Sequence, residues 1–162
     1  MGIRQIYKQG EEILTKKCRE VTDFGPRLWA LLDDMHDTVK KANGAGLAAP
    51  QVGIMRRVAV VLNDDGNFIE IINPEIIHRE GKQEDAEGCL SFPGIYGMVT
   101  RPNVIQVKYQ DRDGKWIMRT AEGFTARAFC HEIDHLDGHL YVELVEGELH
   151  DAVYEEEEIE EE

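Results

Sequence analysis

The sequence lacks the features of a secreted or membrane-spanning protein. Its first residues, MGIRQIYKQGEE, contain no apolar signal-peptide core, and no apolar run approaches the length of a membrane span. The chain has only three cysteines, Cys18, Cys89 and Cys130, and this odd count argues against a disulfide framework. We therefore expect a cytoplasmic protein without membrane contact. Each cysteine is then either a buried apolar side chain or a group with a chemical role.

Basic residues are also scarce. The 162-residue chain has 18 lysines and arginines against 32 acidic residues, which gives a net charge of −14. No cluster of lysine and arginine suggests a phosphate-binding surface, so we expect no direct nucleic-acid binding. Eight acidic residues and no basic one lie in 151–162. This run of like charges predicts a solvated, disordered tail that follows a single domain over residues 1–150.

Two segments have the apolar spacing of a helix. The first is 27–43, where apolar residues recur at helical spacing and Pro26 suits the first turn. The second begins near Thr125, a plausible N-cap, and stops at the Asp-Gly pair 137–138. Weaker patterns predict a short helix at 10–16, extended chain at 18–21 and a short strand or turn at 140–144.

Four apolar or alternating runs predict strands at 56–63, 67–77, 104–111 and 115–120. An Asp-Asp-Gly turn joins the first two strands and an Arg-Asp-Gly turn joins the last two, so each pair reads as a hairpin. Short turns between neighbouring strands favour antiparallel sheets. The stretch 81–103 between the hairpins is too irregular to be one strand.

The stretch 130–138, Cys-His-Glu-Ile-Asp-His-Leu-Asp-Gly, contains the strongest chemical pattern. His131 and His135 are four residues apart, so on a helix their rings leave the same face one turn apart and can hold one metal ion. Glu132 lies beside them and can reach a water on that metal rather than the metal itself. This division of roles is what a hydrolytic site needs.

A catalytic metal site usually has three protein ligands, so a third ligand must come from elsewhere. Cys89 is the first candidate, because it lies in a Glu-Gly-Cys-Leu-Ser loop beside a strand-rich scaffold. Cys130 competes with it, but on a helix its side chain points about 100° away from that of His131. Cys18 has no polar neighbourhood that suggests chemistry.

Residues 44–53, GAGLAAPQVG, predict a loop of small residues whose backbone can pair with an extended peptide. Gln51 is the first side chain in this loop that can take part in chemistry, through its amide. A tight connection from helix to strand would explain the glycines but not Gln51. A phosphate-binding loop is disfavoured, because the segment follows a helix and lacks the Lys-Ser/Thr ending.

Three motifs together resemble those of the peptide deformylase family. Residues 44–51 resemble its Gly-x-Gly-x-Ala-Ala-x-Gln motif. Residues 87–91 are similar to its Glu-Gly-Cys-Leu-Ser motif, and residues 131–136 to its His-Glu-x-Asp-His-Leu motif. Their order and separations also fit, and three motifs in one small chain are far more specific than a single His-Glu-x-x-His. The likeness extends over residues 3–147.

The resemblance implies an α+β fold in which antiparallel sheets pack around a central helix that carries the HExxH motif. It implies a hydrolase that removes the formyl group from N-formylmethionyl peptides. Cys89, His131 and His135 are then ligands of one divalent metal ion, commonly Fe(II) in the cell and replaceable by zinc, nickel or cobalt. A transient association with the ribosome is a further expectation, although the acidic tail would be repelled by ribosomal RNA.

The same resemblance assigns roles to further residues. Glu132 is the general acid/base, and Gln51 and the backbone N–H of Leu90 stabilise the oxyanion. Glu87 is expected to pair with Arg101 and so to brace the loop that carries Cys89. The substrate-binding residues are Gly44, Ala45 and Gly46, whose backbone pairs with the peptide, and Ala45, Phe124 and Ala128, which line the methionine pocket.

Two other interpretations stay open at this point. A related metallopeptidase or amidase would use the same metal and base on a different acyl group. A non-catalytic binding module would hold a structural metal, but such a site usually closes its fourth position with a protein ligand. Cys130 and Asp134 are awkwardly placed for that closure. Cys130 also stands where many family members carry glutamine.

Overall fold

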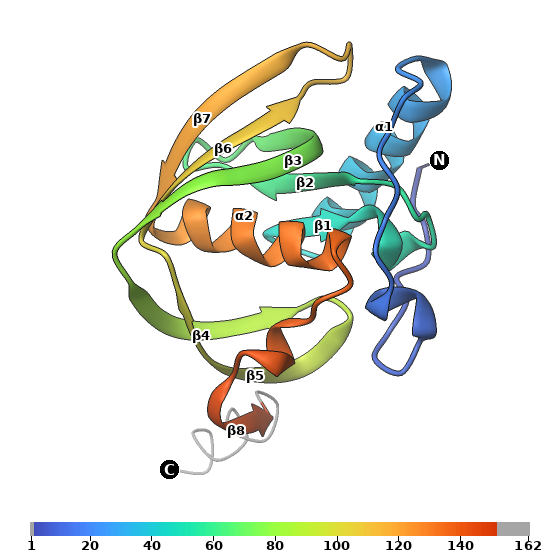
Figure 1. Ribbon diagram of the computed structural model, residues 1–162. Helices are drawn as coiled ribbons and strands as arrows, with labels where there is room; N and C mark the ends of the chain where they lie inside the picture. Colours follow the sequence, from blue (N-terminus) through green and yellow to red (C-terminus); the bar gives the residue numbers. More distant parts are fainter. Residues whose placement is uncertain (1, 152–162) are drawn as a thin grey trace.

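A computed structural model describes residues 2–151, which form two antiparallel sheets with a helix between them (Figure 1). The larger sheet has the strand order β1-β2-β3-β6-β7, and the smaller one has the order β4-β5-β8. Helix α2 (Gly123–Leu136) runs between the two sheets, and α1 (Pro26–Lys41) lies at one side of the larger sheet (Figure 1). This α+β arrangement is the predicted one.

All pairings between the strands of the two sheets are antiparallel within the described residues. The larger sheet consists of β1 (Gly46–Ala48), β2 (Val58–Leu62), β3 (Phe68–Glu80), β6 (Val104–Gln110) and β7 (Trp116–Glu122). The smaller sheet consists of β4 (Gln83–Cys89), β5 (Phe92–Arg101) and β8 (Glu146–Asp151). Residues 2–151 also contain three short 3₁₀ helices, η1 (Glu12–Thr15), η2 (Ala49–Val52) and η3 (Tyr141–Glu143).

Each of the two helices has its apolar residues on one face. That face packs against the larger sheet. Helix α1 buries Leu32, Met35 and Val39 in a cluster that includes residues of β1 and β2. Helix α2 buries Phe129 and Ile133 in a second cluster, with residues of β2, β3, β6 and β7. Burial of such a side chain contributes about 1.5–3 kcal/mol. The second cluster therefore holds α2 in place against the larger sheet.

The two predicted hairpins are confirmed as β2–β3 and β6–β7. The glycine in each turn, Gly66 and Gly114, has a φ of +85°, a conformation that a residue with a Cβ atom rarely adopts. The predicted short helix at 10–16 appears as η1.

Two local predictions need correction, and two segments contain strands that were not predicted. Residues 81–103, which are too irregular for one strand, form a hairpin of two strands, β4 and β5. Residues 46–48 of the expected loop form the edge strand β1. Helix α2 begins at Gly123, so Thr125 is no N-cap; its hydroxyl donates to Asp64 instead. Residues 140–144 contain a 3₁₀ turn, and the strand β8 that follows was not predicted.

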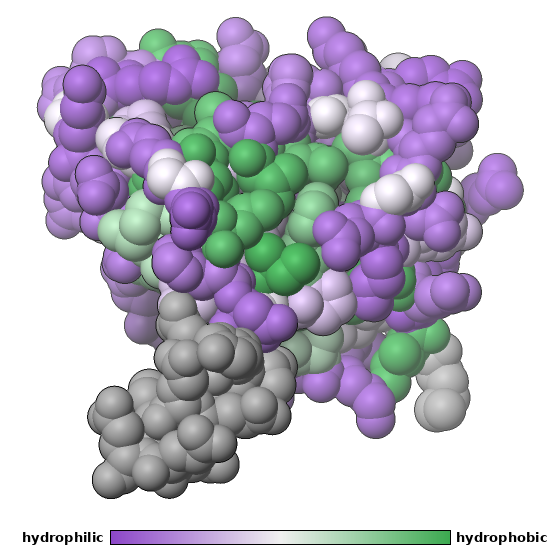
Figure 2. Space-filling view, turned by 90° about the horizontal axis from the view of Figure 1, so that it is seen from below, coloured by the Kyte–Doolittle hydropathy of each residue, from purple (hydrophilic) through white to green (hydrophobic). Residues whose placement is uncertain are grey.

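The smaller sheet keeps part of its apolar surface accessible. Phe92, Val99 and Tyr141 form its buried cluster, and Ile95 and Val145 among others pack against it half-buried. Seen from below Figure 1, the side on which this sheet lies, the molecule shows hydrophobic side chains in the middle of the face, framed by hydrophilic ones (Figure 2).

Within residues 2–151 no helix is long and apolar enough to cross a membrane. The predicted tail at 151–162 lies outside these residues, except for Asp151, the last residue of β8.

Candidate metal centre

Three side chains from two elements meet at one point between α2 and the smaller sheet. Cys89 ends β4, and His131 and His135 lie one turn apart on α2. The Sγ atom of Cys89 lies 3.3 Å from Nε2 of His135, which lies 3.2 Å from Nε2 of His131. All three donor atoms lie within 4.8 Å of one another. One thiol and two imidazoles at this spacing form a donor set that suits a divalent transition metal.

The strand pairing is irregular next to Cys89. Gly88 on β4 faces Tyr96 on β5, and the next residue, Cys89, faces Phe92, so residues 93–95 of β5 have no partner on β4. The Glu-Gly-Cys-Leu-Ser motif is therefore the end of a strand and its turn rather than a free loop.

Glu87 decides which nitrogen of His131 carries the hydrogen. Its carboxylate oxygen Oε1 lies 2.6 Å from Nδ1 of His131. An ionised carboxylate only accepts hydrogen bonds, so in the neutral ring the hydrogen lies on Nδ1, and Nε2 is the nitrogen that faces Cys89 and His135. A carboxylate behind a histidine is the usual partner of a metal-binding imidazole, because it fixes the ring and raises its basicity.

Two arginines hold Glu87 in turn. Arg101 on β5 donates to both of its oxygens, at 2.5 and 3.2 Å, which confirms the predicted pair. Arg127 on α2 donates to the same carboxylate at 2.7 Å and to the backbone oxygen of Val99 at 2.9 Å. Both guanidinium groups are buried. This buried cluster joins β4, β5 and α2, the elements that carry or flank the three donors.

The pKa values of the buried groups at this centre are shifted by burial and by neighbouring side chains. Burial alone would raise the pKa of Glu87, but hydrogen bonds from His131 and Arg101 outweigh it and hold the pKa at about 2. Burial would lower the pKa of His131, but the charge of Glu132 and hydrogen bonds with Cys89 and Glu87 raise it well above its ordinary value. Burial and the neighbouring His131 lower the pKa of His135. Without a metal, one imidazole therefore holds a proton that a divalent cation would replace.

Glu132 lies beside the donors without being one of them. It is 4% exposed, and burial, as the largest cause, raises its pKa to about 7. Its Oε1 atom has no hydrogen-bond partner within residues 2–151. A carboxyl group with a pKa near neutrality can both accept and return a proton at working pH. A Cβ atom on Gly46 would lie 2.5 Å from Oε2 of Glu132, so only glycine leaves room for the carboxylate.

The side-chain amide of Gln51 lies next to the thiol of Cys89. Its Oε1 atom accepts from the backbone N–H of Ala48 at 2.9 Å. Its Nε2 atom donates to Oγ of Ser91 at 3.0 Å and lies 3.5 Å from Sγ of Cys89. Ser91 thus orients the amide of Gln51, a role that sequence reasoning missed although the residue ends the second motif.

A cavity of about 480 Å³ opens at this centre. Its walls contain Cys89, His131 and Glu132 together with all five residues predicted for substrate binding. Gln51 and His135 are not among the lining residues. Of the predicted pocket residues, Phe124 is exposed at the start of α2 and Ala128 is buried. The predicted residues in the lining are Gly44, Ala45, Gly46, Leu90, Phe124 and Ala128.

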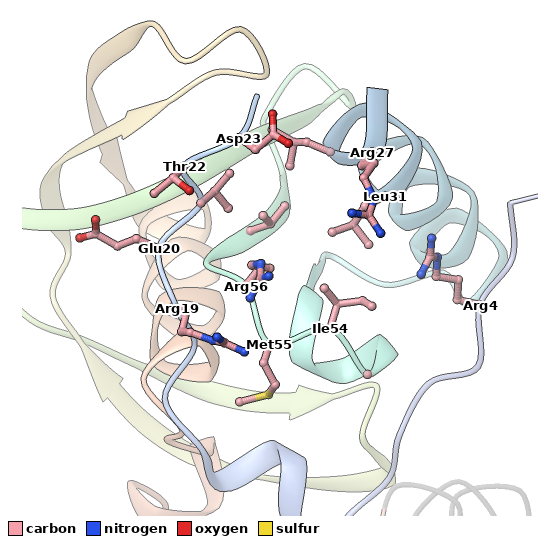
Figure 3. A pocket seen from close by; sticks show the side chains of 14 residues that line it. Arg4, Arg19, Glu20, Thr22, Asp23, Arg27, Leu31, Ile54, Met55 and Arg56 are labelled. Atoms are coloured by element: carbon pink, nitrogen blue, oxygen red, sulfur yellow. The ribbon is translucent and has the colours of Figure 1, made fainter. Parts of the chain in front are cut away.

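A second cavity, of about 810 Å³, lies between α1, the segment that precedes it and the chain after η2 (Figure 3). It shares no lining residue with the first cavity and contains none of the three donors. Arginines are prominent in its lining. Of these two cavities, only the smaller one is therefore lined by any of the three donors.

The other two cysteines lie apart from the donors. Cys18 and Cys130 are both 4% exposed and pack in the apolar cluster around α2. Burial, as the largest cause, raises the pKa of each thiol to about 11. A buried, protonated thiol is a poor ligand and a poor nucleophile. Cys130 is therefore a core residue, although it precedes His131 in the sequence.

Known proteins resemble this chain over almost its whole length. A family model described as polypeptide deformylase matches residues 3–149. The chain belongs to this family. A peptide deformylase from Agathobacter rectalis is 50% identical over 155 residues, which cover 96% of this chain and 98% of the relative. One from Lachnoclostridium phytofermentans is 51% identical over 161 residues, with 98% and 99% covered. Membership confirms the resemblance carried by the three motifs.

Structural similarity supports the same family. The crystal structure of a peptide deformylase from Thermotoga maritima matches with a TM-score of 0.87 and 36% sequence identity, covering 91% of this chain and 100% of the other. Like these relatives, the chain described in Figure 1 is a peptide deformylase, a hydrolase that removes the formyl group from the N-terminal formylmethionine of polypeptides. The family is metal-dependent, and the Cys-His-His group fits that requirement.

Proposed function

We propose that Cys89, His131 and His135 hold the metal ion of this deformylase and that Glu132 is its general acid/base. The observation that carries this proposal is the convergence of the three donor atoms within 4.8 Å beside a buried carboxyl group whose pKa is about 7. A divalent ion held there would supply Lewis-acid activation of water and of the formyl oxygen. Glu132 accepts the proton of the attacking water and delivers it to the leaving amine nitrogen.

The remaining residues bind and orient the peptide. The N–H of Leu90 and the amide of Gln51 donate to the oxygen on which negative charge develops, and loss of one such donor costs about 10²–10³ in rate. Gly44, Ala45 and Gly46 present backbone groups at the outer edge of β1, where an extended peptide adds as a further strand. Ala45, Phe124 and Ala128 line the methionine pocket. Small residues near Glu132 leave room for a formyl group and exclude larger acyl groups.

Substitution of Glu132 by glutamine tests the assignment. Glu132→Gln keeps the shape of the side chain but removes the base, so turnover of a formyl-Met peptide should fall by about 10²–10⁴. Metal content, measured on the same sample by mass spectrometry, should stay at one ion per chain. Retained turnover would exclude Glu132 as the base, and loss of the metal would show that it is a ligand or supports one.

Substrate range separates this proposal from a broader amidase. The enzyme should deformylate a formyl-Met peptide. It should leave the matched acetyl-Met peptide intact. Cleavage of the acetyl or internal amide bond would favour a general metallopeptidase or amidase. A non-catalytic metal module would cleave neither peptide at any metal content.

We further propose that the metal in the cell is Fe(II), because a thiolate and two imidazoles accept Fe(II) as well as zinc, nickel or cobalt. Anaerobic purification followed by metal analysis and a deformylation assay on the same sample tests this. Iron that falls on exposure to air together with activity is the expected result. Full activity of an iron-free zinc enzyme would contradict it.

Two expectations about the cellular setting belong to the proposal. Formylmethionine is present on new polypeptides, so we propose a cytoplasmic enzyme that meets them near the ribosome, through transient association. Residues 1–150 would act as one catalytic domain and residues 151–162 as an acidic appendage that takes no part in catalysis. Removal of 152–162 should leave deformylation unchanged and, because acid repels RNA, should not weaken co-sedimentation with ribosomes.

A further inference from the structure

The second cavity contains most of the arginines that have no side-chain partner among residues 2–151. Among these described residues, six of the ten arginines donate to a side chain of another residue. Of the other four, Arg19, Arg27 and Arg56 line this one cavity, and Arg79 lies on β3. Within residues 2–151 the side chains of these four form no hydrogen bond or ion pair. Three unpaired guanidinium groups around one cavity are notable in a chain with 32 acidic residues.

The backbone places these arginines together. Arg19 and Arg56 face each other in a parallel β-bridge, with hydrogen bonds from Arg19 N–H to Met55 at 3.2 Å and from Arg57 N–H to Arg19 at 2.9 Å. Arg27 lies in the first turn of α1. Figure 3 shows the guanidinium groups of Arg19, Arg27 and Arg56 directed toward the space between these segments, while Glu20 points away from it. The positive groups therefore converge from three separate segments.

The start of α1 adds to this positive charge. A helix N-terminus carries partial positive charge and is usually followed by acidic residues. Here the N-cap Gly25 offers no side-chain cap, and the first turn contains no acidic residue but has Arg27. Arg4, which also lines the cavity, is paired with Asp34 at 2.8 Å, and Asp23 lies at the rim beside α1 (Figure 3). The cavity thus has more positive than negative groups.

The floor of the cavity is apolar. Val21, Leu28, Leu31 and Val58 are buried lining residues, and Ile54 is half-buried. The volume of about 810 Å³ lies within the range of small-molecule sites, about 300–1,000 Å³. A fitting ligand therefore combines several anionic oxygens, which guanidinium groups bind in pairs, with a flat apolar ring that covers the floor. It also has hydroxyl groups that a carboxylate such as Asp23 can accept from.

We propose that this cavity binds a nucleoside diphosphate, with the diphosphate at Arg19, Arg27 and Arg56 and the base on the apolar floor. This goes beyond deformylation, because none of these residues lines the metal centre. Isothermal titration calorimetry of the full, metal-loaded chain with ADP, inorganic pyrophosphate and adenosine tests it. ADP should bind more tightly than either fragment, and its affinity should fall as salt is raised.

Matched variants locate the ligand. Arg19→Gln and Arg56→Gln should each weaken ADP binding about tenfold or more, because each removes a charge-assisted contact. Arg79→Gln removes an unpaired arginine from β3 and should leave binding unchanged. All three variants should deformylate peptides at the wild-type rate, which shows that they are folded. Absence of ADP binding at millimolar concentration, pyrophosphate binding as tight as ADP, or equal weakening by Arg79→Gln would each overturn the proposal.

Discussion

Arg127 shows how far a single residue outside the motifs contributes to the metal centre. It is 3% exposed, and its guanidinium group joins the carboxylate of Glu87 to the backbone of Val99. Glu87 in turn orients His131. Arg101 approaches the same carboxylate from the other strand and also donates to Asp134 at 2.6 Å. Nothing in the sequence around Arg127 marks it, because its partners lie 28 and 40 residues away in the chain.

Substitution of Arg127 by methionine should therefore weaken metal binding. The flexible apolar side chain fills the space but releases one side of Glu87, so the affinity for the metal should fall about 10–100-fold. Competition with a chelator measures this. Arg119→Met is the matched control, since Arg119 donates to Tyr109 and touches no residue of the centre. Equal affinities in both variants would show that Arg101 alone holds Glu87.

Thiol chemistry should distinguish the three cysteines. Burial raises the pKa of Cys18 and Cys130 to about 11, so both remain protonated at pH 8. Cys89 is half-buried at the edge of a cavity. A thiol reagent added to the folded, metal-free enzyme should label only Cys89, and added zinc should protect it. Mass spectrometry of the labelled peptides reads this out, and rapid labelling of Cys130 would contradict the assignment of that residue to the core.

Elements were predictable where periodicity and turn residues agree. The helix around Met35 and the hairpins at Gly66 and Gly114 follow from spacing and turn chemistry alone. The β4–β5 hairpin could not be predicted, because Gly88 and Pro93 weaken the strand pattern and its irregular register depends on pairing between the two strands. Cys89 was nevertheless assigned through its motif, whereas the contact of Ser91 with Gln51 depends on how two distant segments pack.

The approach of β1 to α2 makes a further prediction. A Cβ atom at Gly46 would overlap the carboxylate of Glu132, so Gly46→Ala should displace the base by about 1 Å and reduce kcat about a hundredfold. The fold should persist, because the obstacle is the end of a side chain. Gly25→Ala is the control, since a Cβ there meets only Asp23 at 3.8 Å. Unchanged kcat in Gly46→Ala would mean that the carboxylate of Glu132 can adopt another position that still supports catalysis.

The free energy of unfolding of the whole molecule should fall at low pH. Burial would raise the pKa of Glu70, but hydrogen bonds from His36 and Arg112 outweigh it and lower the pKa from 4.5 to about 2. Glu87 has the same shift. A group whose pKa is lower in the folded state stabilises it fully above the unfolded pKa. We therefore expect this stabilisation above about pH 4.5 and its loss as the pH falls toward 2.

Glu70→Gln tests this linkage. Glu70 joins His36 on α1 to Arg112 in the β6–β7 turn, at 2.8 and 2.5 Å. The variant should be less stable than the wild type at pH 7, with the difference shrinking between pH 4.5 and 2. Urea unfolding at several pH values measures it. Glu75→Gln, in an exposed pair with Lys108 at 3.8 Å, should show a small difference at every pH, and a constant difference for Glu70→Gln would contradict the assigned shift.

The three donors of the metal centre belong to parts of the molecule that are otherwise held together only by packing and polar contacts. Cys89 lies on the smaller sheet, while His131 and His135 lie on the helix that packs against the larger one. A cation shared among them binds the folded chain and not the unfolded one. By mass action, each tenfold rise in free cation above its dissociation constant therefore adds about 1.4 kcal/mol to the free energy of unfolding. If these residues hold the metal as proposed, its availability should raise the free energy of unfolding of this chain as well as its activity.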